Sequence, residues 1–206
     1  LDATNASVFY LDDESELAGL AEDVKQAARE AAERDTEGAH ANVKADGKAG
    51  QGRWKLTLQA PCFFPVMQYA DNRALREKLY YAHQTRASEF GKPELDNTSL
   101  INQILSKRKE AANLLGYRSH AEVSLVAKMA DSPRQVMDFL NDLAARARPF
   151  AEKDYAELKA FAAAELNLKD LQSWDLAYVS ERLRVKRYAF SDQEVKQYFP
   201  EPKVLE

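Results

Sequence analysis

Residues 172–190, QSWDLAYVSERLRVKRYAF, predict a helix that opens on a tryptophan–aspartate pair and ends in a basic tail. Glu181 lies within a stripe of apolar and aromatic residues at helical spacing: Trp174, Tyr178, Val185 and Tyr188. Stripes of this kind are usually buried in a core. Asp175, in the first turn, is placed to interact with the positive end of its own helix or with a cation from a neighbouring element. The spacing alone therefore favours a packing element over a catalytic one.

Apolar periodicity and capping residues predict further helices on both sides of this stretch. Ser119 with Glu122 and Ser132 with Gln135 have the spacing of capping boxes, and Ser173 is expected to cap the helix of the opening stretch. A proline, Pro149, implies a kink or break in one of the predicted helices. The expected helices cover about residues 15–34, 71–88, 97–115, 119–130, 132–165, 173–190 and 191–199. We therefore expect a mainly α fold with about seven helices.

One small β-hairpin is expected between the first two of these helices. Glycines and alternating polarity between residues 37 and 60 suggest ANVKA (41–45) paired with WKLTL (54–58). The proline-flanked segment PCFFP (61–65) is expected to run extended. The predicted organisation of 1–206 is one helical segment, with a helical lead-in (1–36), the hairpin (37–60) and a helical body (71–198).

Composition argues against several classes of partner. A formal net charge of −4 from 29 basic and 33 acidic residues creates no field that would gather nucleic-acid phosphates. No run of about 18 apolar residues is present to span a membrane. The first residues show no secretory signal, and a lone Cys62 fits a reducing compartment. We expect a cytoplasmic protein with neither a nucleic-acid nor a membrane partner.

No motif for a metal or phosphate site emerges from the residues. His40, His83 and His120 are too widely spaced for a helical metal pair. The glycines of GKAGQG (47–52) lack the following G-K-[ST] of a phosphate loop and are expected at a hairpin tip. The basic tail, Arg182 to Arg187, does not form one stripe on a helix and is expected to be a solvated surface.

Three stretches together resemble the thimet oligopeptidase family of zinc metallopeptidases, and within it the oligopeptidase A branch. The stretches are RALREKLYYAHQTRAS (73–88), RKEAANLLGYRSHAEVSLVAKMADSPRQVMDFL (108–140) and WDLAYVSERLRVKRYAFSDQEVKQYFP (174–200). The last resembles that family's W-D-x-x-Y motif at Trp174, Asp175 and Tyr178. The resemblance implies a cytoplasmic zinc endopeptidase that trims short peptides in a channel between two mainly helical lobes.

The chain departs from that family in one respect. The family's chemistry depends on H-E-x-x-H and a later glutamate, which hold zinc and activate water, and none of these occurs between Leu1 and Glu206. We therefore expect an interior piece of a larger two-lobed helical peptidase, with no catalytic residue, no metal ligand and no cofactor of its own, the zinc belonging to the full-length parent. Trp174, Asp175 and Tyr178 are expected to form a structural motif. Asp175, Tyr178 and Glu181 are alternative candidates for the wall of the substrate channel.

Two other functions stay open from the sequence. The chain could be a stand-alone helical module that binds a partner helix or peptide. A weaker alternative is a helical nucleic-acid-binding domain. In the peptidase interpretation the partners are the catalytic remainder of the parent and its short-peptide substrates, and exposed faces are expected to allow non-native self-association.

Overall fold

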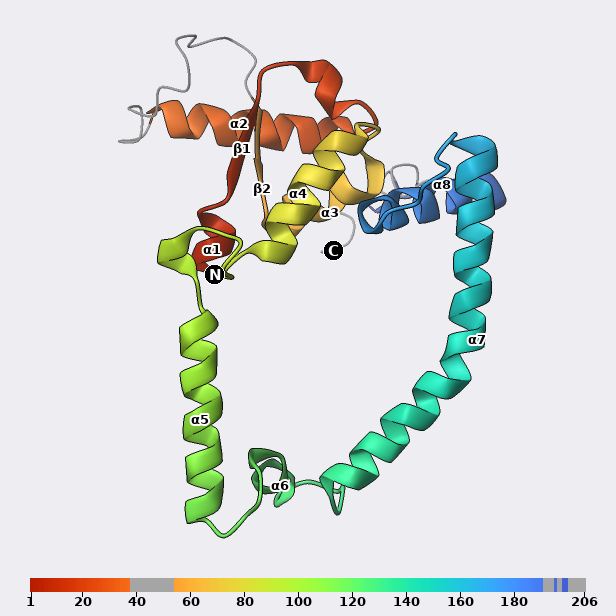
Figure 1. Cartoon of the computed structure of the whole chain (residues 1–206). Coiled ribbons are helices and arrows are strands. Elements are labelled where there is room, and N and C mark those ends of the chain that lie inside the picture. The colour runs from red at the N-terminus through yellow and green to blue at the C-terminus, as the bar shows by residue number, and fades with distance from the viewer. Residues whose placement is uncertain (38–53, 191–194, 196–197, 200–206) are drawn as a thin grey trace. The chain divides into compact units, whose positions relative to one another are not determined.

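The computed structural model describes residues 1–37, 54–190, 195, 198 and 199 of the chain (Figure 1). Within them, eight α-helices and two strands occur, so the mainly α prediction is confirmed. The elements are α1 (Asp2–Asn5), β1 (Val8–Leu11), α2 (Glu22–Glu37), β2 (Trp54–Thr57), α3 (Ala60–Tyr69), α4 (Arg73–Thr85), α5 (Thr98–Leu114), α6 (His120–Leu125), α7 (Pro133–Glu165) and α8 (Leu176–Tyr188), with short 3₁₀ turns η1 (Glu14–Leu17), η2 (Pro93–Leu95) and η3 (Ser173–Asp175). No described helix is both long enough and apolar enough to cross a membrane.

The chain divides into two compact units. The first contains residues 1–86 and 158–206, and the second contains residues 87–157. Among the described residues, every buried hydrophobic side chain except Ala112 belongs to the first unit. The single-segment organisation expected from the sequence stays a prediction.

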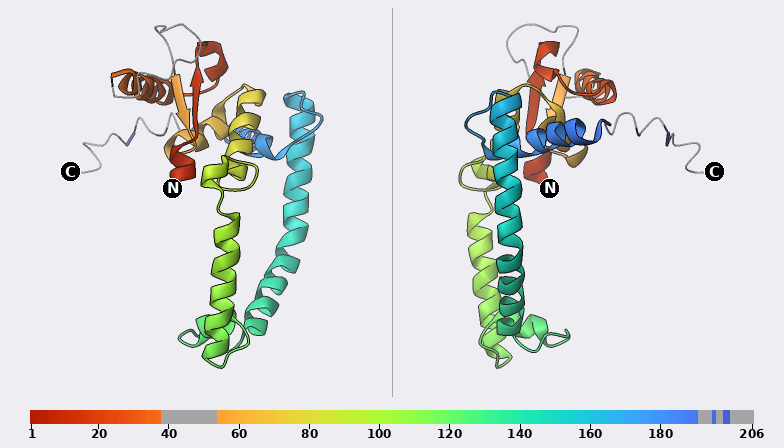
Figure 2. Two further views of the ribbon diagram at one scale, coloured as in Figure 1. Left: turned by 60° about the vertical axis from the view of Figure 1, so that its left-hand side comes forward. Right: turned by 90° about the vertical axis from the view of Figure 1, so that its right-hand side faces the viewer.

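A two-stranded antiparallel sheet forms one part of the first unit. β1 pairs with β2 in the register Val8↔Thr57 to Leu11↔Trp54. Trp54 and Leu56 alternate with half-buried neighbours, the pattern of a strand with one covered face. Helix α2 lies beside the strands in Figures 1 and 2. The predicted strand at 54–58 is therefore present, but its described partner is residues 8–11. The segment 41–45, expected to form the other half of a hairpin, lies outside the described residues.

The prediction for residues 61–65 was wrong, because they belong to helix α3. Pro61 sits in the first turn, where its missing N–H removes no helical hydrogen bond, and Pro65 lies inside the helix. Phe63, Val66 and Met67 are buried in the core of the first unit. Burial of this apolar face outweighs the local penalty of an interior proline.

The helix expected from residue 15 begins later, at Glu22. A glycine, Gly19, has a φ of +87° and places a turn between η1 and α2. Leu17 and Leu20, which seemed part of a helical stripe, are core residues on either side of this turn. The periodicity identified the right apolar residues but not the turn between them.

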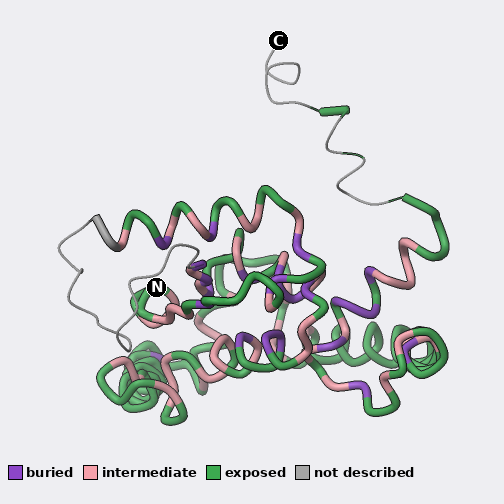
Figure 3. The backbone as a smooth tube through the Cα atoms, turned by 90° about the horizontal axis from the view of Figure 1, so that it is seen from above, coloured by how far each residue is buried: buried purple, intermediate pink, exposed green. Residues whose placement is uncertain are grey.

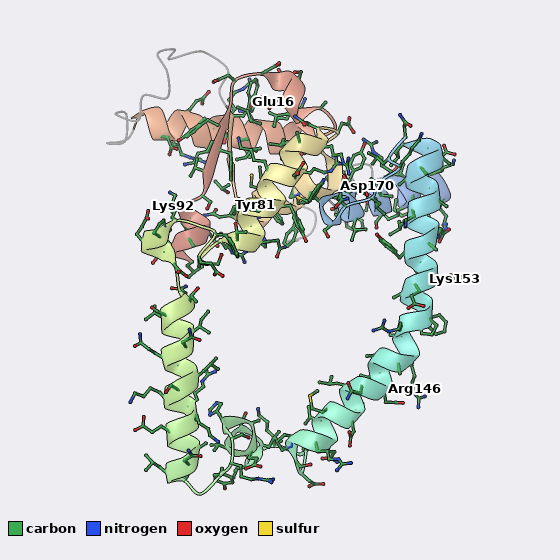
Figure 4. All side chains as sticks on the ribbon, viewed as in Figure 1. Glu16, Tyr81, Lys92, Arg146, Lys153 and Asp170 are labelled. Atoms are coloured by element: carbon green, nitrogen blue, oxygen red, sulfur yellow. The ribbon has the colours of Figure 1, made fainter. Side chains whose placement is uncertain are left out.

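The remaining predicted helices are found as α4 to α8, while the one expected over 191–199 falls mostly outside the described residues. Ser119 accepts a hydrogen bond from the N–H of Glu122, and Ser132 accepts one from the N–H of Gln135, as the capping boxes predicted. Helix α7 continues through Pro149, and it bends between Arg146 and Lys153 in Figure 4. The proline thus kinks the helix without ending it.

Candidate functional site

A buried carboxylate, Asp175, forms the centre of a polar cluster in the first unit. It closes the η3 turn just before α8 and its side chain has no exposed surface. One oxygen accepts the backbone N–H of Gln172 at 3.1 Å. This contact caps the turn, so Ser173, expected to be the cap, lies inside the turn and Gln172 takes the cap position.

Two arginines of α4 neutralise this carboxylate. Arg76 Nη2 donates to Asp175 Oδ1 at 2.8 Å, and Arg73 Nη2 donates to Oδ2 at 2.8 Å. Arg73 Nε lies 3.1 Å from both oxygens. Burial alone would raise the pKa of Asp175, but the hydrogen bonds from the arginines and from Gln172 outweigh it and hold this pKa below its usual range. The carboxylate is therefore ionised at neutral pH.

Arg76 is itself only 1% exposed, and its remaining donors bond to backbone carbonyls. Nη1 donates to the oxygen of Ala70 at 2.6 Å, and Nε donates to the oxygen of Trp174 at 3.3 Å. Buried guanidinium groups persist where such partners compensate the lost water. The Arg76–Asp175 pair thus joins the start of α4 to the start of α8.

A second group of contacts lies one turn further along α8. The hydroxyl of Tyr178 donates to Asp71 Oδ1 at 2.8 Å, and Arg182 also pairs with this carboxylate. Two guanidinium groups lie over the Tyr178 ring, with the Arg76 Cζ 4.1 Å and the Arg182 Cζ 5.0 Å from its centroid. Burial, together with the hydrogen bond to Asp71, raises the pKa of Tyr178. The phenol is therefore neutral at physiological pH.

Glu181 provides the third contact, again on the same side of α8. Its Oε2 accepts from Gln68 Nε2 of α3 at 3.0 Å, and both of its oxygens accept from Arg184 at 2.7–2.8 Å. Glu181 is 6% exposed. Successive turns of α8 are thus held against α3 and the α4 region by polar contacts.

The loop around Gly19 supports this arrangement from the N-terminal part of the chain. The N–H of Asp71 donates to the carbonyl of Ala18 at 2.8 Å. A Cβ on Gly19 would lie 2.2 Å from the carbonyl oxygen of Tyr69 and 2.9 Å from Asp71 Cγ. Only glycine allows both this close approach and the positive φ.

The candidate residues from the sequence are thus brought together, with partners that the sequence did not reveal. Trp174 is half-buried against the core of the first unit, and its ring centroid lies 6.2 Å from that of Tyr80. Of the two partners considered for Asp175, its own helix end and a neighbouring cation, the structure shows cations, from Arg73 and Arg76. The signal that could have identified Arg76 is its place between Leu75 and Leu79, both on the apolar face of its helix, because an arginine there needs a buried anion.

The basic tail of α8 is partly solvated, as expected: Lys186 and Arg187 are exposed, while Arg182 and Arg184 are half-buried. Arg182, Arg184 and Lys186 pair with Asp71, Glu181 and Glu165, respectively. The positive charge of these three side chains is therefore balanced by carboxylates of the same chain. No described part of the tail presents the continuous stripe that a phosphate backbone would need.

The described residues do not fit a zinc site. No group of three or more His, Cys, Asp or Glu side chains able to hold a metal is found among them. His83 stacks on Phe63 at a centroid distance of 4.1 Å, and burial, together with the charge of Arg86, lowers its pKa. His120 is exposed at the first residue of α6, and His40 lies outside the described residues.

The sequence of the chain matches a known protein family. The model for Peptidase family M3 matches residues 66–206, more than half of the chain. The chain belongs to Peptidase family M3. The resemblance drawn from the three sequence stretches is thereby confirmed, and the Arg76–Asp175–Tyr178 cluster lies entirely within the matched region.

Individual relatives from bacteria and a plant align with this chain over its whole length. Oligopeptidase A of Salmonella typhimurium and Oligopeptidase A of Escherichia coli are each 44% identical over 207 residues, which cover 100% of this chain and 28% of each relative. A protein of Arabidopsis thaliana named Probable cytosolic oligopeptidase A is 40% identical over 210 residues, again 100% of this chain and 28% of the relative. The chain thus spans little more than a quarter of the length of these relatives.

Proposed function

We propose that this chain is a noncatalytic helical segment of a cytoplasmic, zinc-dependent oligopeptidase that resembles oligopeptidase A and hydrolyses short peptides. The observation that carries this proposal is the 44% identity along the entire chain to proteins named Oligopeptidase A, of which it covers 28%. The described residues offer no metal-binding group, and the sequence has no H-E-x-x-H. The word cytosolic in the name of one plant relative supports the compartment.

In this proposal the role of the Asp175 cluster is structural. The carboxylates of Asp175 and Glu181 already accept hydrogen bonds from arginines of the chain, and the Tyr178 hydroxyl already donates to Asp71. A bound peptide would have to displace these partners to reach the same atoms. We therefore assign the cluster to holding α8 in place, while the alternative that these three residues line a substrate channel stays a prediction.

A chimaeric enzyme tests the proposal. The 207 aligned residues of Escherichia coli oligopeptidase A would be replaced by this chain, and hydrolysis of a short fluorogenic peptide would be measured with and without a zinc chelator. We expect chelator-sensitive hydrolysis by the chimaera and none by the 206-residue chain. A folded chimaera without activity, or an isolated chain with chelator-sensitive activity, would refute the proposal.

A stand-alone interaction module is the competing function. It is favoured by the many exposed apolar residues on α5 and α7. It predicts that the isolated chain binds a short peptide or helix with the same affinity as the chimaera does. The proposed function instead predicts peptide binding only in the chimaera, measured by fluorescence anisotropy with a labelled, uncleaved peptide.

A further inference from the structure

Helix α5 carries an apolar stripe that the described residues leave about half exposed. Its stripe residues are between 50% and 56% exposed: Leu100, Ile101, Ile104 and Leu105. At about 100° per residue these positions share one side of the helix, while Asn102, Ser106 and Lys109 lie opposite. Arg108 crosses the stripe one turn later. Over the whole of Thr98–Leu114 only Ala112 is buried.

The first part of α7, residues 133–157, carries a second stripe of the same kind. Its exposed members, from 46% to 72% exposed, lie on one broad side of the helix: Met137, Phe139, Leu140, Leu143 and Phe150. None of residues 133–157 is buried. Seen end-on in Figure 3, α5 and this part of α7 are almost wholly coloured as exposed.

Charged side chains on the polar side of α7, by contrast, pair with one another. Ion pairs at i, i+4 spacing run along it: Arg134–Asp138, Asp142–Arg146 and Arg148–Glu152. Such pairs are typical of a face that stays in water. The helix therefore has one face suited to solvent and one face that is suited to protein but lacks a cover.

Helices of this length do not gain their stability from propensity alone. Most helical stability in proteins comes from packing an amphipathic face, and isolated helices are marginal in water. Apolar surface left in water costs about 25 cal/mol per Å² relative to burial. Burying the two stripes against another protein surface would therefore be favourable. A partner that presents an apolar face of its own could bury them.

We propose that the stripes of α5 and α7 are the docking surface for the remaining polypeptide of the same oligopeptidase, so that the partner is in cis. This inference rests on the proposed function. The aligned relatives carry about 72% of their length outside the region that this chain matches, which supplies such a partner. A tethered segment acts at an effective concentration of roughly millimolar, far above that of a second copy. We expect the partner face to be mostly apolar, because the stripes themselves are apolar and the charges on the same helix sides, Arg108 and Asp154, come one turn past their last members.

The first test uses the 206-residue chain by itself. Sedimentation velocity gives its oligomeric state, and amide hydrogen exchange gives the protection of residues 98–114 and 133–157. We expect unprotected or weakly protected amides in both stretches. Strong protection in a monomer would mean that the stripes cover each other, and strong protection in a dimer would mean that a second copy covers them. Either result overturns the proposal.

The second test uses the chimaera with Escherichia coli oligopeptidase A. We expect amide exchange in both stretches to slow by about a hundredfold or more relative to the isolated chain. Ile104→Glu with Leu140→Glu should reverse this protection, while the control pair Asn102→Glu with Ala145→Glu adds the same charge to the opposite faces and should leave it unchanged. An active chimaera whose α5 and α7 stay unprotected would refute this docking surface but not the proposed function. An inactive chimaera with protected helices would refute the proposed function but not this docking surface.

Discussion

At the scale of single residues, Asp175 combines complete burial with two arginine partners, and this combination determines the effect of a substitution. Asp175→Asn keeps the shape but leaves Arg76, which is 1% exposed, without its anion. Removing one partner of a buried pair costs about 3–5 kcal/mol. We expect a loss of this size in the free energy of unfolding, measured by urea titration with Trp54 and Trp174 fluorescence.

A matched control distinguishes the effect of losing a buried ion pair from the effect of losing an aspartate charge. Asp138→Asn also removes an aspartate that faces an arginine, but the Arg134–Asp138 pair is exposed and 3.6 Å apart. Exposed pairs contribute about 0–1 kcal/mol. Equal effects of the two substitutions would show that the Asp175 cluster does not stabilise the first unit.

The same carboxylate predicts a dependence on pH. Burial raises the pKa of Asp175, but the hydrogen bonds from Arg73, Arg76 and Gln172 lower it further, so its folded value lies below the ordinary 3.8. The stabilisation is therefore complete above the unfolded pKa and is lost as the pH falls through the folded pKa. Between about pH 5 and about pH 2, the wild type should lose stability more steeply than Asp175→Asn. Parallel curves from urea titrations across this range would contradict the assignment.

At the scale of elements, the turn between η1 and α2 is tied to the junction of α3 and α4 through Gly19. Gly19→Ala introduces both a strained positive φ and a Cβ that lies 2.2 Å from the Tyr69 oxygen. Gly116→Ala is the control, because its φ is +82° but a Cβ there meets nothing within 4 Å. Backbone strain alone costs about 1–2 kcal/mol. We expect Gly116→Ala to show that cost and Gly19→Ala to exceed it, in thermal unfolding of the chimaera, where α5 and α7 are expected to be protected, followed by circular dichroism.

The elements also show what a sequence can and cannot predict. Capping by Ser119 and Ser132 was predictable because it depends on residues three apart. Helix α3 was not, since burial of Phe63 and Val66 outweighs two prolines that locally favour an extended chain. The partner of β2 was not either, because residues 8–11 lie far away in sequence and no local pattern records such a pairing.

At the candidate site, too, local features could be predicted from the sequence and tertiary contacts could not. The spacing of the stripe predicted the burial of Tyr178 but not the exposure of Tyr188, and it left open whether Asp175 meets its own helix end or a neighbouring cation. The identity of the cations, Arg73 and Arg76, depends on how α8 meets α4, about 100 residues earlier in the sequence. That contact is tertiary and carries no local signal except the arginine on the apolar face of its helix.

At the scale of the whole molecule, the distribution of burial distinguishes the two units. The first unit has its own core, whereas the second contributes only Ala112 to the buried hydrophobic residues of the described chain. A unit without a core needs cover from elsewhere, because net stability is a small difference between burial and lost conformational entropy. This contrast agrees with the proposal that the chain, which spans 28% of the length of these relatives, works within a larger protein.

The most direct measurement is the zinc content per polypeptide after dialysis, determined by mass spectrometry of the metal for both the 206-residue chain and the chimaera. A structural segment without the metal-holding residues should retain close to no zinc, whereas the chimaera should retain about one zinc ion. Stoichiometric zinc on the isolated chain would contradict the proposed noncatalytic role.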